Sequence, residues 1–262
     1  MARLVISAAH KSSGKTTVSI GLCAALAARR LKVQPFKKGP DYIDPMWLSA
    51  AAGRTCRNLD FYTMAVSDIR ETFGRHAHDA DISLVEGNKG LYDGVDLEGS
   101  NSTAALARWL EAPVVLVIDT MGMTRGIAPL LLGYRSFEPD LRIGGVILNK
   151  VSGPRHEKKL RDTVAHYTDI PVLGAIQRSS TMEIVERHIG LIPANEAAET
   201  AAVVGAIRDT VAAQVDLDAL LALARSVPEC CLEATPLPAF PPSSLRIGIA
   251  RDAAFGFYYP DD

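Results

Sequence analysis

Residues 9–16 are the feature of this sequence that most limits the folds it can adopt. They read Ala-His-Lys-Ser-Ser-Gly-Lys-Thr, a phosphate-binding P-loop in which Ala9 replaces the usual first glycine. A short apolar run at residues 4–7 precedes the loop, and a helical pattern at residues 15–29 follows it. A strand, a loop and a helix in this order are the context in which a P-loop binds phosphate. The sequence therefore predicts a nucleotide-binding α/β domain.

The chemistry expected of this loop follows from its residue types. Backbone N–H groups of the loop and of the helix N-terminus point at anionic phosphates. The ammonium of Lys15 reaches the β- and γ-phosphates, and the Thr16 hydroxyl can bind Mg²⁺. The residues predicted to bind the nucleotide are Ser12, Ser13, Gly14, Lys15, Thr16 and Thr17. The alternative is a serine-rich turn before an ordinary helix, and Lys11 either adds to phosphate binding or is simply solvated.

Short apolar runs alternate with longer helical patterns along the first 227 residues. The predicted strands are residues 4–7, 33–36, 82–86, 114–119, 145–148 and 172–176. The predicted helices are residues 15–29, 103–110, 125–134, 156–166, 196–211 and 215–224. Such alternation is typical of parallel βαβ units, and apolar runs without a polar face suit a sheet covered on both sides. We therefore predict a doubly wound, mainly parallel sheet with helices on both faces.

Composition excludes several classes of protein. Net charge is −2, which gives no electrostatic case for nucleic-acid binding. No apolar stretch approaches the roughly 18–20 residues that span a bilayer, and no secretory signal is present, so we expect a cytoplasmic chain. The four cysteines contain no CxxC pair and predict free thiols. Cys23 is expected in the core, and the adjacent Cys230 and Cys231 are taken as incidental.

The chain changes character at residues 228–244. Five prolines fall in this span, which we interpret as an interdomain linker following a domain at residues 1–227. Residues 245–250 then resemble a first strand, so residues 245–262 are predicted to open a second domain.

Carboxylates follow two of the predicted strands, where open α/β sheets place ligands. Residues 37–45 read Lys-Lys-Gly-Pro-Asp-Tyr-Ile-Asp-Pro, and we predict a rigid loop that brings Asp41 and Asp44 near phosphate and Mg²⁺. The alternative is a charged surface turn. Glu86 ends the third predicted strand, where a metal-binding acid stands in P-loop enzymes. Glycines on both sides of Asp93 allow a close approach of backbone to ligand.

Two further strand ends carry polar residues with open interpretations. Asp119 either orients Mg²⁺ or caps the following helix. Asn149 either reads a purine edge or caps a turn. No aspartate follows Lys150 at the position that selects guanine, so guanine specificity is not predicted.

Together these motifs resemble the cobyrinate a,c-diamide synthase family. They are SSGKTT, KKGPDYIDP, VEG with GLYDG, PVVLVIDTMGMTRG, GGVILNKV and ERHIGLIPA, in order along the whole chain. The resemblance implies an ATP-dependent amidoligase domain with a dethiobiotin-synthetase-like fold, followed by a class I glutaminase domain. Residues 245–262 resemble the opening of that second domain. None of the four cysteines matches the glutaminase nucleophile, so this chain is not expected to hydrolyse glutamine.

The resemblance also implies roles for individual residues. Its ATP and Mg²⁺ site would use the loop residues above, with Asn149 at the adenine. Residues matching the catalytic region are Lys15, Asp41, Tyr42, Asp44 and Asp93, and those matching the metal region are Thr16, Asp41 and Glu86. Arg187 and His188 fall in a family motif whose role does not follow from their chemistry.

The implied reaction is amidation of carboxylates a and c of cobyrinic or hydrogenobyrinic acid through an acyl phosphate, in cobalamin biosynthesis, with ammonia from glutamine. Sirohydrochlorin, its nickel form and sirohaem are alternative acceptors. A dethiobiotin-synthetase-type ligase is a second alternative. A MinD-type ATPase is a third, although His10 stands where such proteins carry a second lysine. The oligomeric state is open, with a homodimer among the alternatives.

Overall fold

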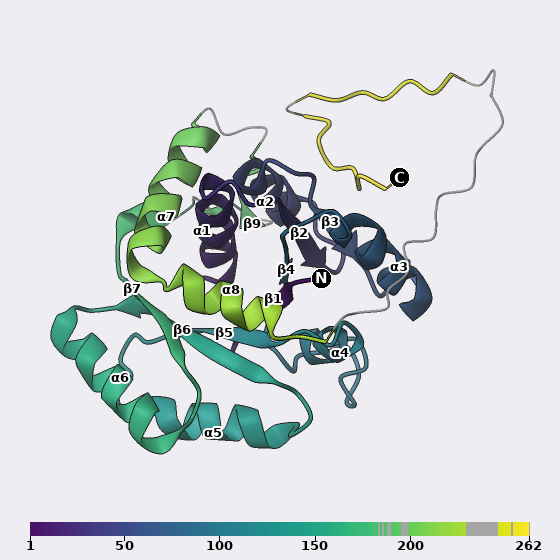
Figure 1. Ribbon diagram of the computed structural model, residues 1–262. Helices are drawn as coiled ribbons and strands as arrows, with labels where there is room; N and C mark the ends of the chain where they lie inside the picture. Colours follow the sequence, from purple (N-terminus) through teal and green to yellow (C-terminus); the bar gives the residue numbers. More distant parts are fainter. Residues whose placement is uncertain are drawn as a thin grey trace.

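The computed structural model describes residues 1–182, 184, 186–187, 190–194, 199–228, 246–252 and 254–261. These residues form a seven-stranded sheet in the order β3-β2-β4-β1-β5-β6-β7, in which every neighbouring pair is parallel (Figure 1). Its strands are β1 Arg3–Ala8, β2 Val33–Lys38, β3 Arg57–Leu59, β4 Ile82–Glu86, β5 Val114–Asp119, β6 Ile143–Val151 and β7 Val172–Gln177. A short antiparallel pair, β8 Glu186–Arg187 and β9 Gly190–Leu191, lies apart from this sheet.

Helices cover both faces of the sheet. They are α1 Lys15–Ala28, α2 Ile43–Ala52, α3 Val66–Ala77, α4 Thr103–Trp109, α5 Ile127–Phe137, α6 Pro154–Tyr167, η1 Ser180–Met182, α7 Thr200–Gln214 and α8 Leu217–Arg225. One apolar cluster joins the sheet to α1, α2, α7 and α8, and a second joins it to α3, α4, α5 and α6. In β1, Leu4 and Ile6 belong to the first cluster and Val5 to the second, because side chains alternate across a strand. The predicted doubly wound fold is confirmed.

The central position of β1 places the P-loop in the middle of the sheet's carboxyl edge. β1 pairs with β4 on one side and with β5 on the other. Strands β2 and β3 lie beyond β4, whereas β6 and β7 lie beyond β5, so the strand order reverses direction at β1. Ligands of open α/β sheets bind at such a switch point. The fold therefore brings the loops after β1, β2, β4 and β6 to one rim.

The six predicted strands are confirmed, each within three residues of its bounds. The short strand β3 and the helices α2 and α3 were not predicted. The expected rigid loop at residues 37–45 was wrong in part, because Lys37 and Lys38 continue β2 and Ile43 already begins α2. Pro45 misleads a sequence reading here, since proline is tolerated in the first turn of a helix, where the N–H has no intrahelical partner.

The predicted strand at residues 245–250 was wrong for its described part. Residues 246–250 lie in no strand, because none of the described strands lies beside them to complete a ladder. Farther along, the rings of Phe257 and Tyr259 stack on Tyr42, with centroids 5.6 and 4.6 Å away. The predicted linker at residues 228–244 lies outside the described residues except for Pro228, and the second domain stays a prediction.

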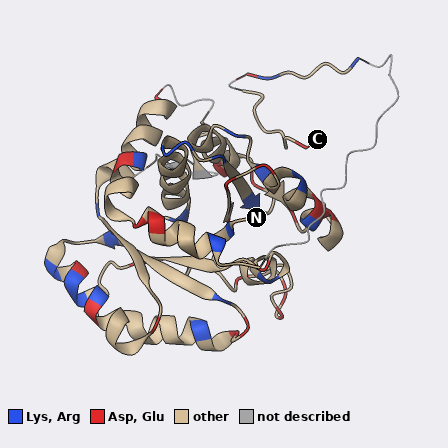
Figure 2. Ribbon diagram, in the orientation of Figure 1, with Lys and Arg blue, Asp and Glu red and all other residues tan. Residues whose placement is uncertain are grey.

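Charged side chains of both signs are interspersed on the surface helices. Figure 2 shows blue and red alternating along α6, which reflects pairs such as Lys158 with Asp162 and Arg161 with Glu157. No described helix combines the length and apolar character needed to cross a bilayer. Cys23 and Cys56 are buried and unpaired, and burial raises the pKa of both thiols. Cys230 and Cys231 lie outside the described residues.

Candidate functional site

The P-loop is held in shape by a side chain from another strand. Gly14 adopts φ +85°, and a Cβ added there would lie 2.2 Å from Nδ2 of Asn149, so only glycine fits. Nδ2 of Asn149 donates to the Ser13 carbonyl at 2.9 Å, and Asn149 itself is buried. Lys150 donates to the Ser12 carbonyl at 3.2 Å. The end of β6 therefore braces the loop that would cradle phosphates.

Replacing Asn149 by alanine should lower the free energy of unfolding by about 1–3 kcal/mol, because the buried Ser13 carbonyl loses its donor. The same change should weaken binding of a non-hydrolysable ATP analogue, since the loop loses its brace. Urea unfolding and calorimetry measure the two effects. The matched control Asn101→Ala removes an amide that accepts an exposed N–H of Val95, and should leave nucleotide affinity unchanged. Equal affinity in both variants would contradict the bracing role.

Lys37 is the centre of a buried charge cluster beside the P-loop. Its side chain is 1% exposed, and Nζ lies 2.5 Å from Oδ2 of Asp44 and 3.1 Å from Oε1 of Glu86. Oδ2 of Asp41 is 3.7 Å away. The register of β2 with β4 pairs Lys37 directly with Glu86, and the first turn of α2 adds Asp44. Sheet pairing and one helix turn thus assemble the cluster.

The P-loop helix completes this cluster. Oγ1 of Thr16 donates to Oε1 of Glu86 at 2.6 Å and lies 3.3 Å from Oδ2 of Asp44. Nζ of Lys15 lies 3.6 Å from the same Glu86 oxygen. Glu86 therefore contacts both P-loop side chains that the motif assigns to phosphate and metal.

Burial and charge oppose each other within the cluster. Burial acts to lower the pKa of Lys37, but Asp44, Glu86 and Asp41 together raise it above its ordinary value. Burial lowers the pKa of Lys15, against the attraction of Glu86. Burial raises the pKa of Glu86, against Lys37, whereas the pKa of Asp44 is lowered because Lys37 outweighs its burial. Lys37 is thus the permanent cation that keeps these carboxylates charged.

The residues present fit a magnesium ion that arrives with a nucleotide. Oε2 of Glu86 is buried without a hydrogen-bond partner, next to the Thr16 hydroxyl. Mg²⁺ typically takes one or two carboxylates together with phosphates and water. In the described part of the chain, no three His, Cys, Asp or Glu side chains converge on one metal position. The donor set thus suits a Mg²⁺–nucleotide complex, in which the neighbouring oxygens of Thr16, Glu86 and Asp44 would lie beside the ion.

Other predicted residues take different positions. Oδ1 of Asp41 accepts the backbone N–H groups of Ile43 and Asp44, both at 3.0 Å, so Asp41 starts α2 and only its second oxygen faces Lys37. Tyr42 is 37% exposed beside it. Oδ2 of Asp93 accepts the Gly90 N–H at 2.9 Å, outside the Lys37 cluster.

Asp119 does not join the cluster either. It pairs with Lys150 at 2.7 Å and accepts the Met121 N–H at 2.9 Å in the turn after β5. The capping alternative was wrong, because the following helix α5 begins at Ile127 with Gly126 as its N-cap and has no side-chain cap. Arg187 forms part of β8, and His188 lies outside the described residues.

A hollow of about 140 Å³ adjoins the start of α1, between the P-loop and the end of β6. Its lining residues include Gly14, Thr17, Asn149, Lys150 and Met182. Thr17 and Asn149, both predicted to bind nucleotide, therefore line one hollow beside the loop. Whether Asn149 contacts adenine stays a prediction, because its Nδ2 is engaged by Ser13.

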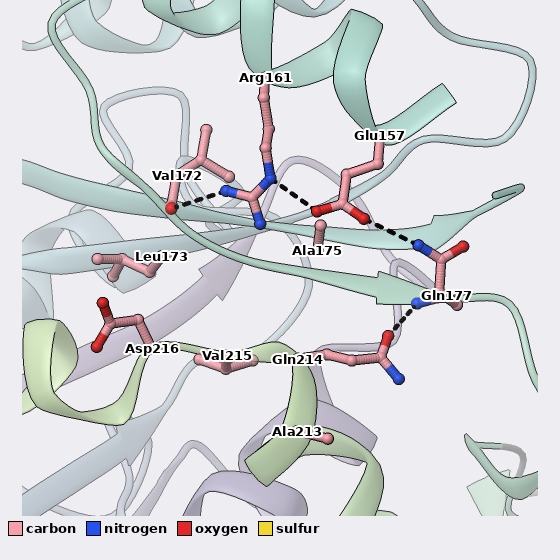
Figure 3. A pocket seen from close by; sticks show the side chains of 10 residues that line it. All are labelled: Glu157, Arg161, Val172, Leu173, Ala175, Gln177, Ala213, Gln214, Val215 and Asp216. Atoms are coloured by element: carbon pink, nitrogen blue, oxygen red, sulfur yellow. Dashed lines mark hydrogen bonds and ion pairs between the residues drawn. The ribbon is translucent and has the colours of Figure 1, made fainter. Parts of the chain in front are cut away.

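A larger hollow, of about 550 Å³, lies at the edge strand β7 (Figure 3). Its polar groups satisfy one another: Arg161 pairs with Glu157, Gln177 donates to Glu157, and Gln214 accepts the Gln177 N–H. No predicted site residue lines it. Size alone therefore does not make it the functional site.

Sequence reasoning did not single out Lys37 as a site residue. The Lys-Lys pair before the glycine was noticed, but adjacent strand residues point to opposite faces. Only the position of β2 relative to the P-loop shows that Lys37 faces α1 and α2. The sequence signal that could have indicated Lys37 is a strand that ends in lysine and is followed directly by a segment with two aspartates.

Comparison with known proteins agrees with this geometry. The profile of the CobQ/CobB/MinD/ParA nucleotide binding domain matches residues 5–192. Cobyrinate a,c-diamide synthase from Magnetococcus marinus is 49% identical over 99% of this chain and 57% of its own length. The enzymes of that name from Syntrophotalea carbinolica and Methanosarcina acetivorans are each 43% identical, again over 99% of this chain. The chain spans a little over half the length of these curated relatives.

Solved structures support the fold alone. The signal recognition particle receptor FtsY from Elizabethkingia anophelis superposes with a TM-score of 0.51 at 14% identity, over 79% of this chain and 66% of that one. Chloroplast FtsY from Physcomitrella patens gives 0.50 at 20% identity, over 79% and 65%. The sequence matches and the P-loop fold together place the chain in the CobQ/CobB/MinD/ParA nucleotide binding domain family, among relatives that are cobyrinate a,c-diamide synthases.

Proposed function

We propose that this chain carries out the ATP-dependent step of a carboxylate amidation, with cobyrinic acid as acceptor. The observation that carries the proposal is the convergence of Lys15, Thr16 and Lys37 on Glu86 at the end of the P-loop. Two lysines and a hydroxyl at this place suit two anions that must meet, a nucleotide γ-phosphate and a substrate carboxylate. The names of the relatives supply the acceptor.

The proposed reaction has two steps. An oxygen of the acceptor carboxylate forms a bond to the γ-phosphorus while the bond to ADP breaks, which gives an acyl phosphate. Ammonia then attacks the acyl carbon, phosphate leaves with the bonding electron pair, and the nitrogen loses a proton to give the amide. Activation is required because a free carboxylate carries delocalised charge and has no adequate leaving group.

The chain's own residues lower the cost of the first step. Lys15, at the start of α1, is positioned for the phosphates, and Lys37, between Asp44 and Glu86, for an incoming carboxylate. Fixed cations in a buried site stabilise developing charge more than the same groups do in water. Mg²⁺, held by Thr16 and Glu86 with Asp44 nearby, would neutralise charge on the phosphoryl oxygens.

The nitrogen source and the acceptor belong to the proposal as well. We infer that ammonia normally comes from glutamine through a class I glutaminase domain, because the tail resembles the opening of one. Sirohydrochlorin, nickel-sirohydrochlorin and sirohaem stay as alternative acceptors, since no residue in the cluster distinguishes among tetrapyrroles that carry acetate arms. Cobalamin biosynthesis in the cytoplasm is the corresponding setting.

Mass spectrometry of cobyrinic acid after incubation with the chain, ATP and Mg²⁺ tests the proposal. With ammonium chloride as nitrogen source, mono- and diamide products should form together with stoichiometric ADP. ATP hydrolysis without any amide, from any of the tetrapyrroles named above, would reject the proposal and favour a partitioning-type ATPase.

A further inference from the structure

A second, smaller pocket lies at the same rim, on the opposite side of β2 from the Lys37 cluster. It has a volume of about 60 Å³, and its lining includes Lys38, Lys89, Asp60, Asp93 and Tyr62. Lys37 and Lys38 are consecutive residues of β2, so their side chains point to opposite faces of the sheet. The two sites are therefore neighbours at one edge, separated by a single strand.

Lys38 is a buried cation without an anion. The residue is only 8% exposed, yet among the described residues no acceptor lies within hydrogen-bond or ion-pair distance of its ammonium. Its one close partner is the ring of Phe61, whose centroid is 5.0 Å from Nζ. Burial, together with the charges of Lys37 and Lys89, lowers the pKa of Lys38 to about 8, against the attraction of Asp60. An unpaired buried charge is costly, so a ligand that supplies the missing acceptor gains this energy on binding.

The acids of the pocket do not fill this need. Asp60 uses Oδ1 to accept the Tyr62 N–H at 3.0 Å, and its Oδ2 is buried without a hydrogen-bond partner. Asp93 is engaged by the Gly90 N–H. Lys89 adds a second ammonium without a described acceptor, from a backbone at φ +51° that is uncommon outside glycine. Lys38 and Lys89 are therefore the two cations of the pocket that lack a described acceptor, and they favour an anion; Asp93 is the exposed carboxylate of the same lining.

We propose that the Lys38–Lys89 pocket binds a second carboxylate of the acceptor while another carboxylate reacts at the Lys37 cluster. This inference rests on the proposed function, in which one acceptor carries at least two carboxylates. About 60 Å³ equals the share of roughly two water molecules, which suits a carboxylate arm and excludes a macrocycle. The ring would remain outside, against Tyr62 and Val95, which are 68% and 70% exposed at the pocket's rim.

Equilibrium dialysis of cobyrinic acid without ATP tests the pocket directly. Lys38→Met should weaken binding at least tenfold, and Lys89→Met should weaken it less, because Lys89 is exposed. Lys38→Arg should keep most of the affinity, since it restores the charge. The control Lys158→Met removes an exposed lysine of α6 and should change nothing. A neutral analogue whose carboxylates are all amides should bind wild type and Lys38→Met equally.

Steady-state kinetics with ammonium separate anchoring from chemistry. In Lys38→Met, KM for the acceptor should rise tenfold or more, while kcat and KM for ATP change less than twofold. Equal acceptor affinity in wild type and Lys38→Met would overturn this inference alone. If cobyrinic acid failed to bind the wild-type chain, the proposed function and this inference would fall together.

Discussion

Lys15→Ala should lower the rate of ATP-dependent amidation by about 10²–10³-fold, the loss that follows removal of one donor from a preorganised anion site. Lys15 opens α1, is 12% exposed at its side chain, and lies 3.6 Å from Glu86. Burial lowers the pKa of Lys15, and the Glu86 carboxylate opposes this shift by stabilising the charged ammonium. A phosphate that binds beside Lys15 therefore meets an ammonium that is already positioned and largely desolvated.

Lys11→Ala is the matched control for this variant, because it removes the same charge from the same loop. Lys11 is exposed, and exposed charges contribute at most about 1 kcal/mol, which corresponds to less than tenfold in rate. Amide formation is measured by mass spectrometry at saturating ATP, with the melting temperature recorded for each variant. Equal losses in the two variants would mean that the loop acts through net charge and that Lys15 has no special position.

The sequence predicts the framework of this fold because the framework is local. A P-loop between a strand and a helix, and apolar runs alternating with helical patterns, are each visible within about fifteen residues. The short strand β3 and the helix α2 were not predicted. β3 has only three residues. α2 follows Gly39 and Pro40 and carries Pro45 in its first turn, and these residues are typical of a loop. β3 is too short to show a periodicity, and the proline in the first turn of α2 conceals its helical pattern.

The site was predicted as a set of residues, but not as an arrangement. Asp44, Glu86 and Thr16 come together because β2 pairs with β4 and α2 turns back toward α1, which no local pattern records. Asp93 and Asp119 satisfy the same local criteria and yet bind neighbouring backbone or Lys150. The catalytic and metal roles of all the predicted site residues stay predictions.

The two lysines at the end of β2 show what burial does to identical side chains. Lys37 has three carboxylates within 4 Å, whereas Lys38 has none among the described residues. Lys37 is already paired with the protein's own acids at the site proposed for the reaction. Lys38 faces the pocket that it lines with Lys89. Substituting each lysine in turn therefore compares a cation that has carboxylate partners with one that has none among the described residues.

Lys37→Met should lower the free energy of unfolding by about 3–5 kcal/mol at pH 7, because it leaves the buried carboxylates of Glu86 and Asp44 with only Lys15, 3.6 Å from Glu86, as a counter-charge. The adjacent change Lys38→Met should cost little or even stabilise, since that lysine has no described anion to lose and only the ring of Phe61 beside its ammonium. Urea unfolding at fixed pH compares the two. Equal effects would contradict the assignment of Lys37 as the cluster's counter-charge.

The pH dependence of the Lys37→Met defect follows from the sign of each shift. Asp44 has a lowered pKa in the folded protein, so its contribution is present above its ordinary pKa of 3.8 and is lost as pH falls through the folded value. Lys37 supplies most of that shift, and without it both acids should protonate at higher pH. The difference in the free energy of unfolding between wild type and Lys37→Met should therefore shrink as pH falls from 7 toward 4.

Adding Glu86→Gln to Lys37→Met should recover part of the lost stability at pH 7, because it removes the buried charge that Lys37 had neutralised. A double variant no more stable than Lys37→Met would show that the loss comes from packing of the lysine stem and not from charge.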